Sequence, residues 1–77
     1  MTLKIISAED VLFEGDVTMV TLPGVMGLFT ILNNHASLVS TLTAGDVVYE
    51  SNGQTESLKI AGGIVDVDNN IVSVCIY

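Results

Sequence analysis

The stretch LPGVMGLFTILNNHASLVSTLTAGD, residues 22–46, carries the clearest folding signal in the sequence. It holds the only proline, the only histidine and three of the seven glycines of the chain. Short runs of Leu, Val, Ile, Phe and Thr alternate in it with the turn-forming pairs Pro-Gly, Asn-Asn and Ala-Gly. Runs of this kind between turn residues are typical of β-strands. No helical periodicity extends between the breaks, so the stretch predicts strands and tight turns.

The same pattern continues on both sides of this stretch. The pair Asn52-Gly53 predicts a hairpin that joins residues 46–51 to residues 54–61. The turn-forming sequence Asp-Asn-Asn at 68–70 predicts a second hairpin between residues 63–67 and residues 71–77. Residues 17–22 and 71–77 are largely apolar on both faces, which favours strands covered on two sides. The sequence therefore predicts a single all-β domain over 1–77, a small two-sheet β-sandwich of about 8–10 short strands with essentially no helix.

The composition indicates a chain with a protein partner. Hydrophobic residues make up 49% of the sequence and charged residues only 14%. A core of this size cannot enclose so many apolar side chains, and those left outside usually mark a contact surface. The net charge of −7, with Lys4 and Lys59 as the only basic residues, argues against binding to nucleic acid or to anionic lipid.

Cysteine usage and the terminal sequence predict an intracellular, soluble domain. Cys75 is the only cysteine, so no disulfide can form within the chain. Residues 1–10 lack the apolar core and small-residue cleavage site of a signal peptide. No apolar run approaches the roughly 20 residues of a transmembrane helix.

No catalytic, cofactor-binding or metal-binding residue is expected. The sequence has no G-x-S-x-G elbow and no P-loop, and a single His with a single Cys is too few ligands for a zinc site. Cys75 lies in an expected strand and is interpreted as a small buried hydrophobic residue. The neighbouring carboxylates flank turns, where acidic residues are usually solvated: Glu9, Asp10, Glu14 and Asp16.

Two alternative functions remain open at this point. A lipoyl-type carrier domain is also small, acidic and all-β, and Lys59 in ESLKIA lies in faintly similar surroundings. Lys59 follows the expected hairpin tip by six residues, however, which disfavours a carrier lysine. A stand-alone binding module is the other alternative.

The opening stretch resembles the N-terminal β-sandwich domain of the epsilon subunit of F-type ATP synthases. That family has a Pro/Ser-Gly-x-x-Gly-x-x-Gly-Ile-x-Pro-x-His-Ala-Pro-Leu pattern followed by a Leu-x-x-Gly turn. Residues 3–17 and 60–74 are similar to its opening strand and its final hairpin. The residues that fit the pattern are Gly24, Gly27, Ile31, His35, Ala36, Leu38, Leu42 and Gly45.

The chain also departs from the family pattern at four positions. Thr30 stands in place of a glycine, and Asn33 and Ser37 in place of prolines. Without these two prolines, the backbone φ angles of the segment are less restricted. Leu28 replaces a frequent acidic residue, so apolar contact is expected there instead of an ion pair.

The resemblance implies a rotor component without chemistry or cofactor of its own. Such a subunit lies in the central stalk at the cytoplasmic face of the bacterial inner membrane. It couples rotation of the c-ring to the gamma subunit and the catalytic head during proton-driven ATP synthesis. Family members continue into a C-terminal helix pair that can inhibit ATP hydrolysis. The chain ends at Tyr77, so no inhibitory arm is expected in it.

The resemblance also implies two partner surfaces. The turn-rich segment is expected to contact the c-ring, through Gly27, Leu28, Asn33, Asn34 and His35. The gamma-facing surface is expected on the last strand, through Val72, Val74 and Ile76. The segment's apolar character would then serve contact with a partner.

Overall fold

Nine strands and no helix make up the computed structural model, which describes residues 1–77. No element is a helix long and apolar enough to cross a membrane. In chain order the strands are β1 (Thr2–Ile6), β2 (Val11–Asp16), β3 (Met19–Gly24), β4 (Gly27–Leu32), β5 (Leu38–Leu42), β6 (Gly45–Ser51), β7 (Gln54–Ile60), β8 (Gly63–Asp68) and β9 (Ile71–Ile76).

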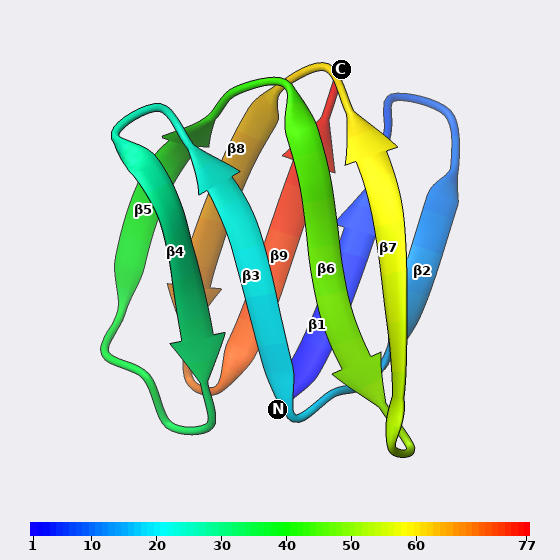
Figure 1. Cartoon of the computed structure of the whole chain (residues 1–77), viewed down its shortest axis with the longest axis vertical. Coiled ribbons are helices and arrows are strands. Elements are labelled where there is room, and N and C mark those ends of the chain that lie inside the picture. Colours follow the sequence, from blue (N-terminus) through cyan, green and yellow to red (C-terminus); the bar gives the residue numbers. More distant parts are fainter.

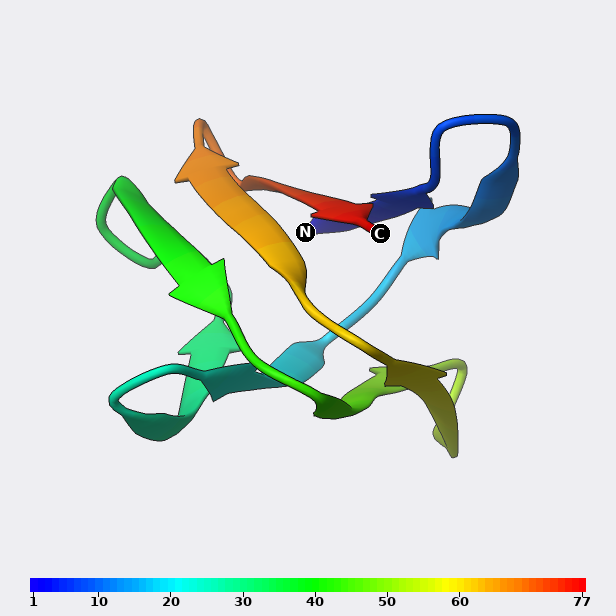
Figure 2. The same ribbon diagram turned by 90° about the horizontal axis from the view of Figure 1, so that it is seen from above.

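The strands lie in two facing layers (Figures 1 and 2). The first layer, called sheet one below, has the order β2-β1-β9-β8-β5, and the second, sheet two, has the order β7-β6-β3-β4. A single Cα pair, Gly24 with Leu42, joins the layers. Only β1 and β9 pair in parallel. The predicted all-β sandwich without helix is confirmed.

Side chains that alternate inward from both sheets form the core. Sheet one contributes Leu3 and Val65 among others, and sheet two contributes Val20 and Ile31, all with 0% exposure. The core cluster contains 14 buried residues and no charged side chain. Full burial of one such aliphatic side chain stabilises the fold by about 1.5–3 kcal/mol. The period-two pattern of the strands therefore supplies most of the stability.

The outer faces of the two sheets are open to solvent. The prediction that residues 71–77 are covered on both sides is wrong, since Ile71 is 47% exposed and Cys75 is also exposed. A sandwich of two layers covers only one face of each sheet. Apolar side chains that point outward from β9 therefore stay on the surface.

Both predicted hairpins are present, and their turns have the backbone conformation that their sequences favour. Asn52 and Gly53 have φ angles of 54° and 76°, and Asn69 and Asn70 have φ angles of 50° and 62°. Two successive positive φ angles define a type I′ turn, in which asparagine and glycine are strongly preferred. The turns therefore set the register of β6 with β7 and of β8 with β9.

Candidate functional site

The tip of the β3–β4 hairpin is an exposed apolar knob. Val25, Met26 and Leu28 are 55%, 97% and 76% exposed, and no charged residue lies among them. Gly27 has φ +124° and nothing within 4 Å of a Cβ placed on it. Its open surroundings and missing side chain let another backbone approach closely.

Sheet one holds this knob in place through backbone hydrogen bonds. The Val25 amide donates to the Thr41 carbonyl at 3.1 Å, and the Thr43 amide donates to the Pro23 carbonyl at 2.8 Å. Both bonds cross from sheet two to the end of β5. The apolar tip is therefore anchored to both layers.

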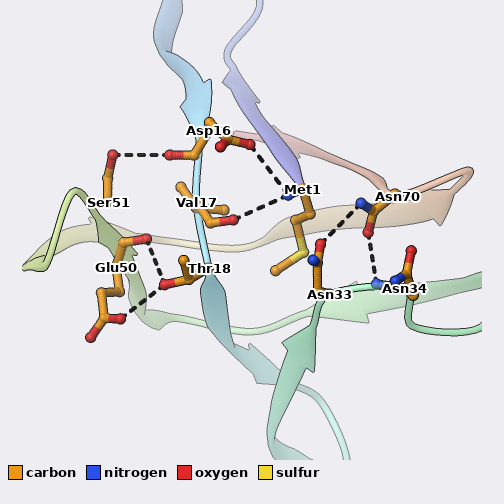
Figure 3. A network of polar contacts seen from close by, with 9 residues as sticks. All are labelled: Met1, Asp16, Val17, Thr18, Asn33, Asn34, Glu50, Ser51 and Asn70. Atoms are coloured by element: carbon orange, nitrogen blue, oxygen red, sulfur yellow. Dashed lines mark hydrogen bonds and ion pairs between the residues drawn. The ribbon is translucent and has the colours of Figure 1, made fainter.

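A second cluster lies at the opposite end of β4, in the loop that leads to β5. Asn70, in the β8–β9 turn, accepts a hydrogen bond from the Asn34 amide at 2.8 Å and donates its Nδ2 to Asn33 Oδ1 at 3.0 Å (Figure 3). The Asn70 carbonyl also accepts from the Thr2 amide at 3.1 Å. One asparagine thus ties the loop to β1 and to the β8–β9 turn. The sequence marked Asn70 as a turn residue but gave no signal for this contact.

His35 is exposed in the same loop. Its amide donates to the Leu32 carbonyl at 3.2 Å, and its Nδ1 lies 2.8 Å from the Ala36 carbonyl oxygen. A carbonyl oxygen only accepts, so Nδ1 carries the proton in this contact. Nε2 makes no hydrogen bond within the chain and is free to contact a partner.

The residues expected to contact the c-ring therefore form two groups. Gly27 and Leu28 lie at one end of β4, and Asn33, Asn34 and His35 follow its other end (Figure 1). Four strand steps between Leu28 and Leu32 span about 13 Å. The expected contact residues therefore do not form one continuous patch.

Side-chain hydrogen bonds fix the loop at the two positions where the family pattern has proline. Asn33 Oδ1 accepts from Asn70, and Ser37 Oγ donates to Asp68 Oδ1 at 2.9 Å. Proline would restrict φ directly. In this chain, contacts with the β8–β9 turn restrain the same loop.

The residues expected to contact the gamma subunit lie mostly in the core. Val72 and Val74 have 0% exposure, and Ile76 is half-buried. The outward residues of β9 are Ile71, Ser73 and Cys75. Val72 and Val74 are therefore unavailable to a partner in this structure. Ser73 is the one polar residue of this strand, and it marks the outward face.

The outer faces of the two sheets differ in character. On sheet one, Lys4 and Glu14 pair at the β1–β2 side, and Asp66 lies beside Val39, which is 73% exposed, at the β5 side. On sheet two, the β4 and β3 half is uncharged. Its outward residues are Leu28, Thr30, Leu32, Met19 and Thr21.

The titratable side chains do not gather at one place. No group of three or more His, Cys, Asp or Glu residues could hold a metal ion. The larger of two hollows, about 400 Å³, is lined by Ser37, Leu38, Val39, Asp66, Val67 and Asp68. Lys59 lies within β7 opposite Asp46 and not at the hairpin tip, which disfavours the carrier interpretation.

Comparison with other proteins identifies close relatives of the sequence. The chain is 45% identical over 69 residues to the ATP synthase epsilon chain of Wolinella succinogenes, covering 88% of this chain and 53% of that one. It is 44% identical over 72 residues to the ATP synthase epsilon chain of Aliarcobacter butzleri, covering 94% of this chain and 58% of that one. The chain thus spans about half the length of the relatives it matches.

Solved structures share the fold. A chain in the cryo-EM structure of the Euglena gracilis mitochondrial ATP synthase superposes with a TM-score of 0.89 at 21% identity, covering 96% of this chain and 48% of that chain. A chain in the central stalk and c-ring structure of the Tetrahymena thermophila mitochondrial ATP synthase superposes with a TM-score of 0.83 at 13% sequence identity. The match covers 97% of this chain and 61% of that chain. The profile of the ATP synthase delta/epsilon chain β-sandwich domain matches residues 1–76. With nearly its whole length inside that profile, the chain belongs to the ATP synthase delta/epsilon family.

Proposed function

We propose that this chain acts in the central stalk of an F-type ATP synthase and couples rotation of the c-ring to the gamma subunit and the catalytic head. The observation that carries the proposal is the family match over residues 1–76. The chain performs no bond chemistry in this role. It is a peripheral component at the cytoplasmic face of the bacterial inner membrane, and proton flow through the membrane sector drives it.

The mechanical properties of the sandwich support this role. A coupling element transmits torque only if it resists deformation, and close-packed interiors have low compressibility. The chain has a 14-residue core and 47 backbone hydrogen bonds, and two of its hairpins close with two-residue turns. Such a body passes a force applied at one surface to another surface without bending.

The two ends of β4 supply the proposed c-ring contacts. At one end Gly27 and Leu28 offer close backbone approach and apolar contact. At the other end Asn33, Asn34 and His35 offer polar groups on a loop that Asn70 restrains. Of the three residues expected to contact the gamma subunit, only Ile76 remains in the proposal, because Val72 and Val74 are fully buried.

Reconstitution tests the proposal and separates the two ends of β4. The chain is added to membranes whose F-type ATP synthase lacks its own epsilon subunit, and proton-driven ATP synthesis is measured. We expect the chain to restore synthesis. Leu28→Ser and His35→Ala should each reduce it by about two- to tenfold, the factor for an interfacial contact worth about 0.5–1.5 kcal/mol.

Thr55→Ala on β7 is the matched control for these variants, because Thr55 is exposed and lies in neither group. It should support synthesis like the unchanged chain. Failure of the unchanged chain to restore synthesis contradicts the coupling role. Restoration with both variants fully active contradicts only the assigned contact residues.

A further inference from the structure

β4 is an edge strand with one neighbour. It pairs with β3 along its whole length and with no other strand. A strand at the edge of a sheet presents a row of unpaired backbone N–H and C=O groups to any other extended chain. The backbone groups of β4 that face away from β3 determine which strand can pair with this edge.

The hydrogen-bonding pattern between β3 and β4 determines which backbone groups of β4 face outward. Pro23 has no N–H, and its carbonyl accepts from Thr43, so Pro23 and its partner Leu28 form a non-hydrogen-bonded pair. Bonded and non-bonded pairs alternate along an antiparallel ladder. Phe29 and Ile31 therefore bond to β3, while the backbone groups of Leu28, Thr30 and Leu32 point to the free edge. The Leu32 carbonyl fits this phase, because it accepts from His35 outside the sheet.

β4 lacks the features that protect the edge strands β2 and β7. β5, the remaining edge strand, is also uncharged, but its end already bonds to the β3–β4 hairpin through the Thr41 carbonyl. β2 carries Glu14 and Asp16 and has an irregular register beside Ile5 and Ile6, and β7 carries Glu56 and Lys59. Charges and bulges of this kind discourage pairing between sheets. β4 reads GLFTIL and has no charge, no proline and no bulge. Between Asp16 and Asp46 the sequence contains no acidic residue, lysine or arginine.

The edge of β4 is also complementary to itself. In an antiparallel pair centred on Thr30, Leu28 lies opposite Leu32 of the other copy, Phe29 opposite Ile31, and Thr30 opposite Thr30. The outward-pointing backbone groups then meet each other, because Leu28, Thr30 and Leu32 share the free phase. Leucine faces leucine on the outer surface, where the two side chains are 76% and 57% exposed.

We propose that the β4 edge pairs with the β4 edge of a second copy of this chain, antiparallel and centred on Thr30, to form a symmetric dimer. The pairing joins the two copies of sheet two into one continuous sheet. A two-fold axis through Thr30 closes the assembly, since the pairing uses the β4 edge of each copy once. The inference goes beyond the proposed function and does not depend on it.

The charges of the two copies oppose the pairing without preventing it. Each chain carries a net charge of −7, but its charged residues lie outside the 17–45 segment that contains β4. Repulsion between exposed charges is screened by salt. The dimer should therefore strengthen as ionic strength rises. Leu32 C=O can join the new ladder through its second lone pair while it keeps the bond from His35.

Sedimentation and hydrogen exchange of the full chain test the pairing and its register together. Between about 10 µM and 1 mM protein, a range that reports micromolar-to-millimolar affinity, the mass should rise from 8.1 kDa toward twice that value. The amides of Leu28, Thr30 and Leu32 should gain protection with concentration. Those of Phe29 and Ile31 should stay unchanged, which also reports that the fold is intact.

Thr30→Lys is the decisive variant, and Thr55→Lys on the β7 edge is its control with the same added charge. Two lysines directly opposite each other repel, so Thr30→Lys should weaken the dimer at least about tenfold. Thr55→Lys should leave it unchanged or strengthen it. A monomer at every concentration, protection of other amides, or a dimer that only Thr55→Lys dissociates would each overturn the proposal.

Discussion

Asn70 shows how one residue can restrain a loop that sequence patterns leave undefined. Its positive φ closes the β8–β9 turn, its carbonyl accepts from β1, and its side chain holds both Asn33 and Asn34 (Figure 3). The family pattern uses proline in the β4–β5 loop. This chain uses an amide from a distant turn, so the restraint depends on tertiary structure.

Asn70→Asp tests this restraint with almost no change in shape. The variant loses the Nδ2 donor that bonds Asn33, and we expect the free energy of unfolding to fall by about 1 kcal/mol. Urea unfolding followed by circular dichroism measures the change. Asn69→Asp is the control, since Asn69 has the same positive φ and is exposed. Equal losses in both variants would show that the side-chain contacts of Asn70 contribute nothing.

Tyr49 gives the fold a dependence on alkaline pH. Burial raises the pKa of the Tyr49 phenol above its ordinary value of 10.0, and the charge of Glu56 raises it further. The folded state therefore holds this proton more tightly than the unfolded state. The resulting stability is complete below about pH 10 and is lost as the pH rises through the folded pKa.

A pair of tyrosine variants isolates this effect. Between pH 9 and 11.5, a range set around the ordinary tyrosine pKa of about 10, the unfolding free energy of Tyr49→Phe should fall less steeply than that of the unchanged chain. Tyr77→Phe should behave like the unchanged chain, because Tyr77 is 79% exposed. Parallel curves for all three proteins would contradict the assignment to Tyr49.

At the scale of elements, the sequence predicts turns well and strand phase less well. Asn52-Gly53 and the 68–70 turn are predictable because few residues tolerate positive φ. The inward face of β9 has a weaker signal, since Ser73 is the only polar residue that distinguishes its two faces. The expected gamma contacts Val72 and Val74 fell on the inner face for this reason.

The same limit applies to the two groups of expected c-ring residues. Gly27 and His35 belong to one continuous motif in the sequence. β4 runs between them as a strand and places them at its opposite ends. Proximity in sequence therefore did not reveal this spatial division.

The start of β8 is predicted to tolerate no side chain at Gly63. A Cβ there would collide with the carbonyl oxygen of Cys75 on β9. Gly63→Ala should lower the unfolding free energy on the order of 3 kcal/mol, because backbone atoms must shift to relieve the overlap. Gly53→Asn is the control, with a φ of +76° that asparagine tolerates and no atom within 4 Å. Chemical denaturation of both variants measures the difference, and a stable Gly63→Ala would contradict the close approach.

At the scale of the whole molecule, the apolar surplus lies on the surface. Met26 at 97%, Leu28 at 76% and Val39 at 73% exposure have no cover within the chain. The composition predicted this surplus, since a small sandwich cannot enclose every apolar side chain. In the proposed role, contact with the c-ring would cover Leu28.

Native mass spectrometry of this chain mixed with its cognate gamma subunit tests the central claim most directly. We expect a stable one-to-one complex at micromolar concentration, the affinity range of a specific interface. The unchanged chain, Leu28→Ser and His35→Ala should all form it, because these positions are proposed to face the c-ring. The chain and the gamma subunit remaining separate throughout that range would contradict a place in the central stalk.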